Sequence, residues 1–323
     1  MAKAIRFYET GSADVLKLEQ VELGEPGPGQ VLVRHTGIAV NFIDIYFRTG
    51  QYPAQLPSGL GSDAVGVVEA IGPGVTEVAV GDRVGYLIGP QGAYADRRIM
   101  PAAVLIRIPD GISDSVAATL MMKGMTAQYL FRQVYPLHGG ETILYHAAAG
   151  GVGLIACQWA RALGVTMIGT VSSEEKAAMA RANGCTHTLI TGRDDIVARV
   201  KEITGGKGVP VVFDSVGKDT LDTSLSCLQP RGSLVSNGTS SGPVIIDTMK
   251  LAAMGSLWLT RPAMMHYIQP REHMLAMADE VFGMVLAGHI HSEAQQTFAL
   301  EDAAQAHRAL ESRKTIGATV LVP

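Results

Sequence analysis

Short segments in which hydrophobic and polar residues alternate fill about the first 120 residues, and this is the pattern of half-buried strands. Glycine and proline separate these segments, most densely at residues 24–29, 72–74 and 89–92. Short strands with such turns predict a barrel or a rolled sheet. The expected strands are residues 4–8, 15–21, 30–34, 64–71, 83–88 and 94–99.

The periodicity becomes helical at residues 114–135, and strand-like and helix-like segments then alternate. This alternation predicts a parallel sheet covered by helices on both faces, and six strands fit the doubly wound dinucleotide fold. The expected strands are residues 142–147, 165–171, 187–190, 209–214, 233–236 and 256–259. The expected helices are residues 153–163, 174–183, 194–204 and 219–228.

The alternation stops after residue 262, where two amphipathic helices are expected at residues 272–288 and 300–312, followed by a strand at 318–322. That last strand needs a partner, and we expect it to return to the N-terminal β-rich part. The predicted fold class is therefore α/β. A β-rich domain of residues 1–122 and 262–323 encloses a Rossmann domain, with a doubly wound parallel sheet, of residues 123–261.

Composition and charge narrow the function classes. Hydrophobic residues make up 47% of the chain and charged residues 17%, which favours a packed core over disorder. A net charge of −4 argues against nucleic acid as a partner, and no apolar run is long enough to span a membrane. The N-terminus lacks the apolar centre of a signal peptide, so we expect a cytoplasmic protein. The three cysteines form no Cys-x-x-Cys pair, which argues against a disulfide framework.

A glycine-rich turn connects the expected strand 142–147 to the following helix. It matches the dinucleotide pattern G-x-G-x-x-G with Ala148 in the first position, followed by Gly150, Gly151, Val152 and Gly153. Gly150 lets the backbone approach a pyrophosphate, and Gly153 lets helix and strand pack closely. The helix N-terminus offers N–H groups to the phosphates. The alternative is a tight strand-to-helix turn without a ligand.

The end of the second strand of this part predicts NADPH rather than NADH. Ser172 and Ser173, with Lys176 one helical turn later, suit a 2′-phosphate, and Arg193 adds positive charge. Glu174 lies at about the spacing at which an NAD enzyme carries its ribose-binding acid. We interpret Glu174 instead as an acid in the first turn of a helix that Ser172 or Ser173 caps.

At this point the sequence resembles the zinc-free quinone oxidoreductases of the medium-chain dehydrogenase/reductase superfamily, the relatives of zeta-crystallin. The resemblance covers nearly the whole chain and implies a GroES-like catalytic domain, an inserted Rossmann domain and a homodimer. Zinc-dependent relatives carry a cysteine within the segment occupied here by residues 40–44, and Gly-His-Glu where this chain has Gly61, Ser62 and Asp63. No metal site is therefore expected. The matching segments are residues 40–50, the glycine turn, 214–217, 236–242 and 311–313.

By this resemblance, Asn41, Asp44 and Tyr46 line the cleft near the nicotinamide, and Tyr52 helps to close the pocket. These are the expected catalytic residues. Ordinary turn chemistry, in which Asn and Asp bond the local backbone, is the alternative for the first two.

The expected cofactor contacts outside the glycine turn follow strand ends, because ligands of doubly wound sheets lie beyond the carboxyl ends of the strands. Asn237 is the residue expected at the carboxamide end, and a solvated lysine or surface arginine is the alternative for each basic residue. Gly192 stands where the family often has tyrosine. The remaining expected contacts are Lys123, Thr126, Ser215, Gly217, Gly238, Thr239, Arg261 and Arg313.

These observations together predict an NADPH:quinone oxidoreductase that acts by hydride or single-electron transfer without a metal, on a small-molecule quinone. Two alternatives stay open. One is an NADPH-dependent reductase of activated C=C bonds, such as enones and alkenals. The other is a crystallin-like or RNA-binding protein without enzymatic activity.

Overall fold

The computed structural model describes all 323 residues, which form two compact units. Unit 1 comprises Met1–Met125, Gln269–Gly288 and Ser292–Pro323, and unit 2 comprises Thr126–Ile268 and His289–His291. The chain therefore leaves unit 1, builds unit 2 and returns. The expected boundaries after residues 122 and 261 lie close to these, but they place Lys123 in the cofactor domain, whereas it belongs to unit 1.

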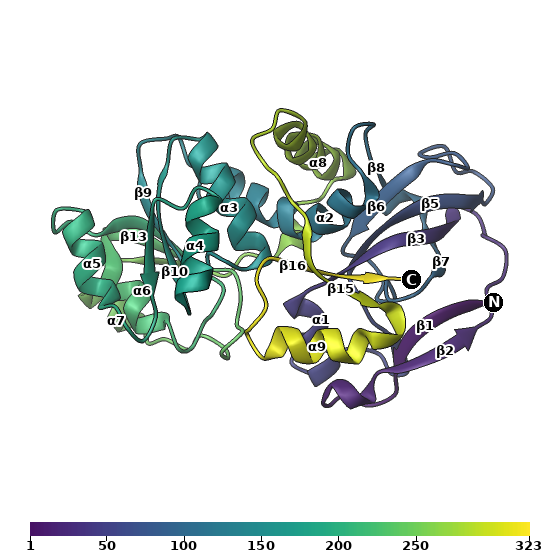
Figure 1. Ribbon diagram of the computed structural model, residues 1–323, viewed down its shortest axis with the longest axis horizontal. Coiled ribbons are helices and arrows are strands. Elements are labelled where there is room, and N and C mark those ends of the chain that lie inside the picture. Colours follow the sequence, from purple (N-terminus) through teal and green to yellow (C-terminus); the bar gives the residue numbers. More distant parts are fainter. The chain divides into compact units, whose positions relative to one another are not determined.

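Two sheets make up the β-rich part of unit 1 (Figure 1). A three-stranded sheet has the order β2-β1-β4, with β1 at Ala2–Phe7, β2 at Lys17–Val21 and β4 at Ser58–Gly59. A seven-stranded sheet has the order β15-β16-β3-β5-β6-β8, and β7 also pairs with β3. Its strands are β3 (Gln30–Val40), β5 (Asp63–Ile71), β6 (Arg83–Leu87), β7 (Arg97–Pro101), β8 (Ile106–Arg107), β15 (Ala294–Ala299) and β16 (Ala318–Val322).

The long strand β3 organises this sheet, since β5, β7 and β16 all pair with it. Its pairing with β5 shifts register twice, and Gly66 lies opposite the second irregularity. A Cβ at Gly66 would stand 2.2 Å from the Arg34 carbonyl oxygen, so only glycine lets the strands approach here. The pairing of β16 with β3 confirms that the last strand returns to the N-terminal part.

Four α-helices belong wholly or mainly to unit 1: α1 (Phe42–Thr49), α2 (Asp114–Tyr129), α8 (Arg271–Leu286) and α9 (Ala303–Glu311). The pattern of hydrophobic and polar residues predicted neither the helix α1 nor the strand β15. The strand expected at 94–99 begins only at Arg97, because the backbone of Tyr94 bonds to Ile5 and Leu60 rather than to β3. Short 3₁₀ turns occur at Ala13–Val15, Ala102–Val104, Met264–His266 and Leu300–Asp302, and a π turn, η3, at Leu130–Val134 extends α2.

Unit 2 is a parallel six-stranded sheet with the order β11-β10-β9-β12-β13-β14, and this confirms the doubly wound prediction. The order reverses between β9 and β12, which is the switch point where such sheets bind ligands. The strands are β9 (Thr142–Tyr145), β10 (Thr166–Val171), β11 (His187–Ile190), β12 (Val209–Asp214), β13 (Leu228–Ser236) and β14 (Trp258–Thr260). The helices are α3 (Gly151–Ala162), α4 (Glu174–Ala182), α5 (Ile196–Ile203), α6 (Leu221–Cys227) and α7 (Thr248–Ala253).

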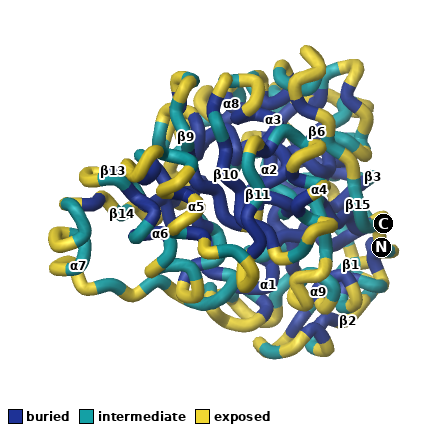
Figure 2. Tube along the Cα trace, turned by 60° about the vertical axis from the view of Figure 1, so that its left-hand side comes forward, coloured by how far each residue is buried: buried dark blue, intermediate teal, exposed yellow.

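Burial follows this architecture. Figure 2 shows β10 as buried over most of its length, in agreement with its position inside the sheet. Two apolar clusters support the sheets, one in unit 1 around Phe7, Val33 and Tyr94, and one in unit 2 around Leu144 and Val212. None of the helices combines the length and the apolar composition that crossing a membrane requires.

Candidate active site

A buried polar chain in unit 1 fixes the side chain of Asn41, the residue that joins β3 to α1. The Lys123 ammonium group donates to Asn41 Oδ1 at 2.8 Å, and Asn41 Nδ2 donates to Asp63 Oδ1 at 2.5 Å. The other oxygen of Asp63 accepts the backbone N–H of Met122 at 3.1 Å. Since an ammonium group only donates and a carboxylate only accepts, the amide has one possible orientation.

Lys123 and Asp63 are the two charged groups of this chain, and the charge of each counteracts the effect of burial on the pKa of the other. Burial lowers the pKa of Lys123, and the negative charges of Asp63 and Asp44 counteract that shift. Burial likewise raises the pKa of Asp63, against the effect of the Lys123 charge and of two hydrogen bonds. Each charge thus counteracts part of the effect of burial on the pKa of the other, with the Asn41 amide between the two groups.

Asp44 is enclosed completely and holds the first turn of α1. Its carboxylate accepts the backbone N–H of Asn41 at 2.9 Å, the Ser62 hydroxyl at 2.9 Å and the Tyr94 hydroxyl at 3.0 Å. Burial, with the nearby charge of Asp63, raises the pKa of Asp44 to about 7 despite these three bonds. The local backbone bond considered as the alternative is present. With no exposed surface, Asp44 positions α1 instead of offering a group to a ligand.

The two expected tyrosines belong to an aromatic group on α1 and the turn after it. The rings of Tyr46 and Tyr52 lie 5.3 Å apart, and the Tyr52 N–H donates to the Tyr46 carbonyl at 2.9 Å. Phe42 contacts the first ring and Phe47 the second, at 6.4 and 5.7 Å. Sequence reasoning missed both phenylalanines, although the i, i+4 spacing of Phe42 and Tyr46 was a usable signal.

In unit 2, the glycine turn brings the start of α3 against the end of β9. Gly150 caps the helix with an extended backbone, and Gly151 and Val152 form its first turn. A Cβ at Gly153 would lie 2.5 Å from the Ala147 carbonyl oxygen, so the turn closes only on a residue without a side chain. The glycines have no side chains that would cover the backbone N–H groups at the start of α3.

The end of β10 has the capping arrangement that the sequence predicts. The Ser173 hydroxyl accepts the Lys176 backbone N–H at 3.3 Å, so Ser173 is the N-cap of α4 and follows the exposed Ser172. Glu174, in the first turn, forms an ion pair with Arg193 at 3.1 Å and another with an arginine on its own helix. These hydrogen bonds lower the pKa of Glu174. The acid therefore serves the helix and its neighbours, as interpreted from the sequence.

The turn after β12 is built around a buried carboxylate that sequence reasoning missed. Asp214 accepts the backbone N–H groups of Val216 and Gly217 at 2.8 and 3.0 Å, and the Ser224 hydroxyl at 2.7 Å. A Cβ at Gly238 would stand 2.4 Å from the carbonyl oxygen of Ser215. The turns that follow β12 and β13 therefore pack closely together at the carboxyl edge of the sheet, and the Ser241 hydroxyl also donates to the Val216 carbonyl at 2.8 Å.

Two acceptors at the end of β13 are enclosed without a partner. These are the hydroxyl oxygen of Ser236 and Oδ1 of Asn237. The neighbouring Thr239 is buried, and the guanidinium group of Arg261 donates to the Ser236 carbonyl at 2.7 Å. A buried acceptor without a donor costs about 1–3 kcal/mol. Such atoms at the carboxyl edge of a doubly wound sheet indicate that a ligand with N–H or O–H groups belongs there.

Four more residues complete the comparison with the expected site. Thr126 lies on α2 and belongs to unit 2, whereas Lys123, one turn earlier, belongs to unit 1. Arg313 follows α9 in unit 1 with a φ of 58°, and Gly192 has a φ of 80° that a tyrosine adopts only with strain. The structure thus gathers the expected catalytic residues in unit 1 and most expected cofactor contacts at one edge of unit 2.

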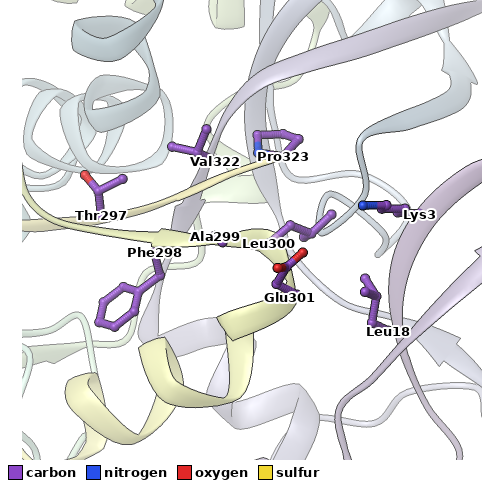
Figure 3. A pocket seen from close by; sticks show the side chains of 9 residues that line it. All are labelled: Lys3, Leu18, Thr297, Phe298, Ala299, Leu300, Glu301, Val322 and Pro323. Atoms are coloured by element: carbon purple, nitrogen blue, oxygen red, sulfur yellow. The ribbon is translucent and has the colours of Figure 1, made fainter.

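The expected site residues form no metal cluster, and they do not line the hollow shown in Figure 3. No three His, Cys, Asp or Glu side chains lie together as a metal site would require. The hollow, of about 410 Å³, lies in unit 1 between β15, the end of β16 and the first strands, and none of the expected residues lines it.

Comparisons with known proteins agree with this layout. Residues 27–110 match the alcohol dehydrogenase GroES-like domain, and residues 151–280 match the family described as zinc-binding dehydrogenase. The chain is 53% identical to a quinone oxidoreductase of Pseudomonas aeruginosa over 100% of both chains. It belongs to the quinone oxidoreductase family of the medium-chain dehydrogenase/reductase superfamily. This confirms the resemblance drawn from the sequence, together with the α/β fold of GroES-like and Rossmann parts.

Two further comparisons extend the match. The chain is 46% identical to a 2-haloacrylate reductase of Burkholderia sp, covering 100% of this chain and 99% of the relative. A solved structure of Escherichia coli quinone oxidoreductase complexed with NADPH is similar with a TM-score of 0.98 and 43% identity, covering 99% of this chain and 100% of the other.

The first prediction concerns Gly153. We expect Gly153→Ala to weaken NADPH binding about tenfold or more, because the new Cβ must push the start of α3 off the turn that would cradle the pyrophosphate. Fluorescence titration with NADPH measures this. Gly283→Ala is the matched control, since Gly283 is an exposed position of α8 with open space around it. Equal affinity in both variants would contradict the role given to the turn.

Proposed function

We propose that this chain reduces quinones with NADPH. The observation that carries the proposal is the 53% identity with a quinone oxidoreductase over the full length of both chains, a match that spans the segments of both units that form the candidate site. Catalysis is favoured over a purely structural role because the buried oxygens of Ser236 and Asn237 have no partner within the protein, which is costly unless a ligand bonds to them.

Unit 2 supplies the cofactor site in this proposal. The glycine turn and the start of α3 hold the pyrophosphate, Ser172, Ser173 and Lys176 hold the 2′-phosphate, and Asn237 Oδ1 accepts the carboxamide N–H. Two structural features support this: Gly153 fits a cradle that a Cβ would fill, and the Asn237 acceptor has no partner within the protein. When bound, NADPH supplies the hydride, and the protein supplies binding and orientation.

Unit 1 supplies the groups that meet the acceptor. The Asn41 amide carries two N–H hydrogens, of which Asp63 receives one, and we assign the other to the substrate carbonyl oxygen. Negative charge grows on that oxygen as the hydride arrives, and the positive charge of Lys123 lies directly behind the amide. Water delivers the proton that completes the hydroquinone, so no strong general acid is required.

The aromatic group on α1 suits a flat acceptor. Tyr46 is buried to 7% exposure, and Tyr52 is half-buried beside it. Aromatic faces and edges contact planar rings favourably without requiring hydrogen bonds of fixed geometry. We therefore propose that these two rings contact the quinone, and that their identity limits its size.

A second candidate function is the reduction of C=C bonds activated by a carbonyl or carboxyl group. The observation that favours it is the 46% identity with a 2-haloacrylate reductase over nearly all of both chains. An amide N–H that stabilises charge on a quinone oxygen also stabilises charge on the oxygen of an enone. The same site therefore serves both reactions, and the relative rates decide between them.

The test of function is NADPH oxidation followed at its absorbance, with 1,4-benzoquinone, a larger naphthoquinone and an enone as acceptors. We expect quinone turnover that exceeds enone turnover and is unchanged by a chelator, because the residues at the zinc positions of relatives are engaged in hydrogen bonds here. Faster enone turnover would favour the second candidate. No turnover with any acceptor would overturn both.

Cofactor preference gives a separate prediction. Lys176→Ala should raise the KM for NADPH about tenfold and leave that for NADH nearly unchanged, because the loss of one charge-assisted contact to the 2′-phosphate costs about 1.5 kcal/mol. Lys207→Ala is the control, since it removes the same charge from an exposed turn of unit 2. A parallel rise for both cofactors would refute this role of Lys176.

We also propose a homodimer formed at β14, and a cytoplasmic location. The strand β14 is an edge of the six-stranded sheet, so one side of its backbone is unpaired. Trp258 on it is 68% exposed, and Ile245 and Met249 just before it in the chain are 85% and 71% exposed. A second copy can pair the same edge about a twofold axis and cover these side chains. The free, buried cysteines fit a reducing compartment.

The dimer proposal predicts that Trp258→Glu yields a monomer, because a charge at the centre of a self-complementary interface faces its own copy. Light scattering after size-exclusion chromatography measures the mass. Leu286→Glu, at an exposed position of α8 in unit 1, should leave the mass at that of the dimer. If both variants and the unchanged chain have the same mass, β14 is not the interface.

A further inference from the structure

Arg48 lies near the end of α1, and only 1% of this charged residue is exposed. Its guanidinium group nevertheless makes four hydrogen bonds. Nε donates to the Gly11 carbonyl at 3.1 Å, and Nη1 lies 3.2 Å from His307 Nδ1. Both Nη atoms donate to the Glu311 carboxylate. Two segments that carried the family resemblance, 40–50 and 311–313, thus meet through this one side chain.

The contact with Arg48 determines the proton position on His307. A guanidinium group only donates, so Nδ1 of His307 must accept and carries no hydrogen. The ring is neutral, because burial and the Arg48 charge lower the pKa of His307 to about 3. Its hydrogen therefore resides on Nε2, which lies 3.0 Å from the Tyr94 hydroxyl oxygen. His307 donates this hydrogen to Tyr94.

The direction of the next bond follows. Because the Tyr94 oxygen accepts from His307, its own hydrogen points to Asp44 Oδ2, 3.0 Å away. The result is a chain in which every bond has one direction, from Arg48 through His307 and Tyr94 to Asp44. Asp44 in turn accepts the N–H of Asn41.

We propose that Arg48, His307 and Glu311 are positioning residues for the reaction: through Tyr94 and Asp44 they hold the start of α1, and with it Asn41, in the orientation that meets the substrate carbonyl. This inference rests on the proposed function, since it gives Asn41 its role. It assigns a task to α9, a helix far from Asn41 in sequence.

A positioning role predicts that activity depends on pH in a way that a simple packing role does not. The titratable and polar groups around Asp44 come from several elements. They are Asn41 just before its helix and Arg48 at the end of it, Ser62 and Asp63 at β5, Tyr94 before β7, Lys123 on α2, and His307 with Glu311 on α9. In the directed chain, the three groups bonded to Asp44 all donate to it. A proton on Asp44 therefore requires that one of these bonds is lost or that a hydroxyl group reverses its direction, and either change disturbs the directed chain.

The pKa of about 7 for Asp44 places this event near neutrality. Asp44 is ionised above that pH, and the chain is intact. As the pH falls through the pKa, Asp44 takes up a proton, and kcat should fall with it. Removing a donor from the chain leaves the carboxylate less stabilised, which raises its pKa and moves this acid limb to higher pH.

The experiment compares kcat and KM across pH in four variants. His307→Leu should lower kcat about tenfold and move the acid limb up by about one pH unit, the size expected for one lost bond to a charge. His307→Gln can accept from Arg48 and donate to Tyr94 with the same spacing, so it should restore kcat to within about threefold. Tyr94→Phe should shift the limb equally. Arg308→Gln, an exposed arginine of α9 paired with Asp14, is the matched control and should behave as the unchanged chain.

Tyr94→Phe keeps the test decisive if His307→Leu fails to fold, because it removes only a hydroxyl group. An unchanged acid limb in Tyr94→Phe, or equal losses in His307→Leu and His307→Gln, would overturn the proposal. A readout independent of activity is the ¹⁵N spectrum of the histidine rings, in which His307 should stay neutral with its hydrogen on Nε2 from pH 5 to 9. A hydrogen on Nδ1 would refute the chain even if no quinone were reduced, whereas a missing quinone turnover alone would refute the proposed function.

Discussion

A carboxylate removed from water must be surrounded by hydrogen-bond donors, and this constraint governs both halves of the site. Asp44 collects donors from three separate segments, and in doing so it brings together the start of α1 and its neighbours. Asp63 does the same for Asn41 and the backbone of α2. In unit 2, Asp214 orders the turn after β12 in the same way. The turns proposed for catalysis and for cofactor binding thus share one physical origin, although they lie in different units.

Sequence reasoning succeeded where a local pattern determines the structure. The strand-turn-helix context of the glycine turn and the alternation of strands and helices predicted the parallel sheet with its correct strands. The cap at Ser173 also followed from residues four positions apart or fewer. It failed where distant contacts decide. The edge strand β15 lacks a clear alternation, and α1 is a short helix held in part by Asp44, whose partners come from elsewhere in the chain.

The same limit explains the candidate site. Asn41 was found through family resemblance, but its partner Asp63 was noticed only as a replacement for a zinc ligand, and His307 was not singled out at all. Nothing near His307 in sequence marks it, because its significance comes from Arg48 and Tyr94, which are hundreds of residues away in the chain. Burial of a polar side chain is a three-dimensional property, and the types of the residues alone do not reveal it.

The close contacts at Gly153 and Gly238 determine which positions of the proposed cofactor site can be substituted and which cannot. At both positions backbone presses on backbone, so every substitution adds atoms where there is no room. The start of α4, by contrast, is on the surface, and Ser172 can be exchanged without disturbing a packed neighbour. If the proposed roles hold, the preference for one dinucleotide over another can change through a few surface exchanges, whereas the glycine turn has no room for any added side chain.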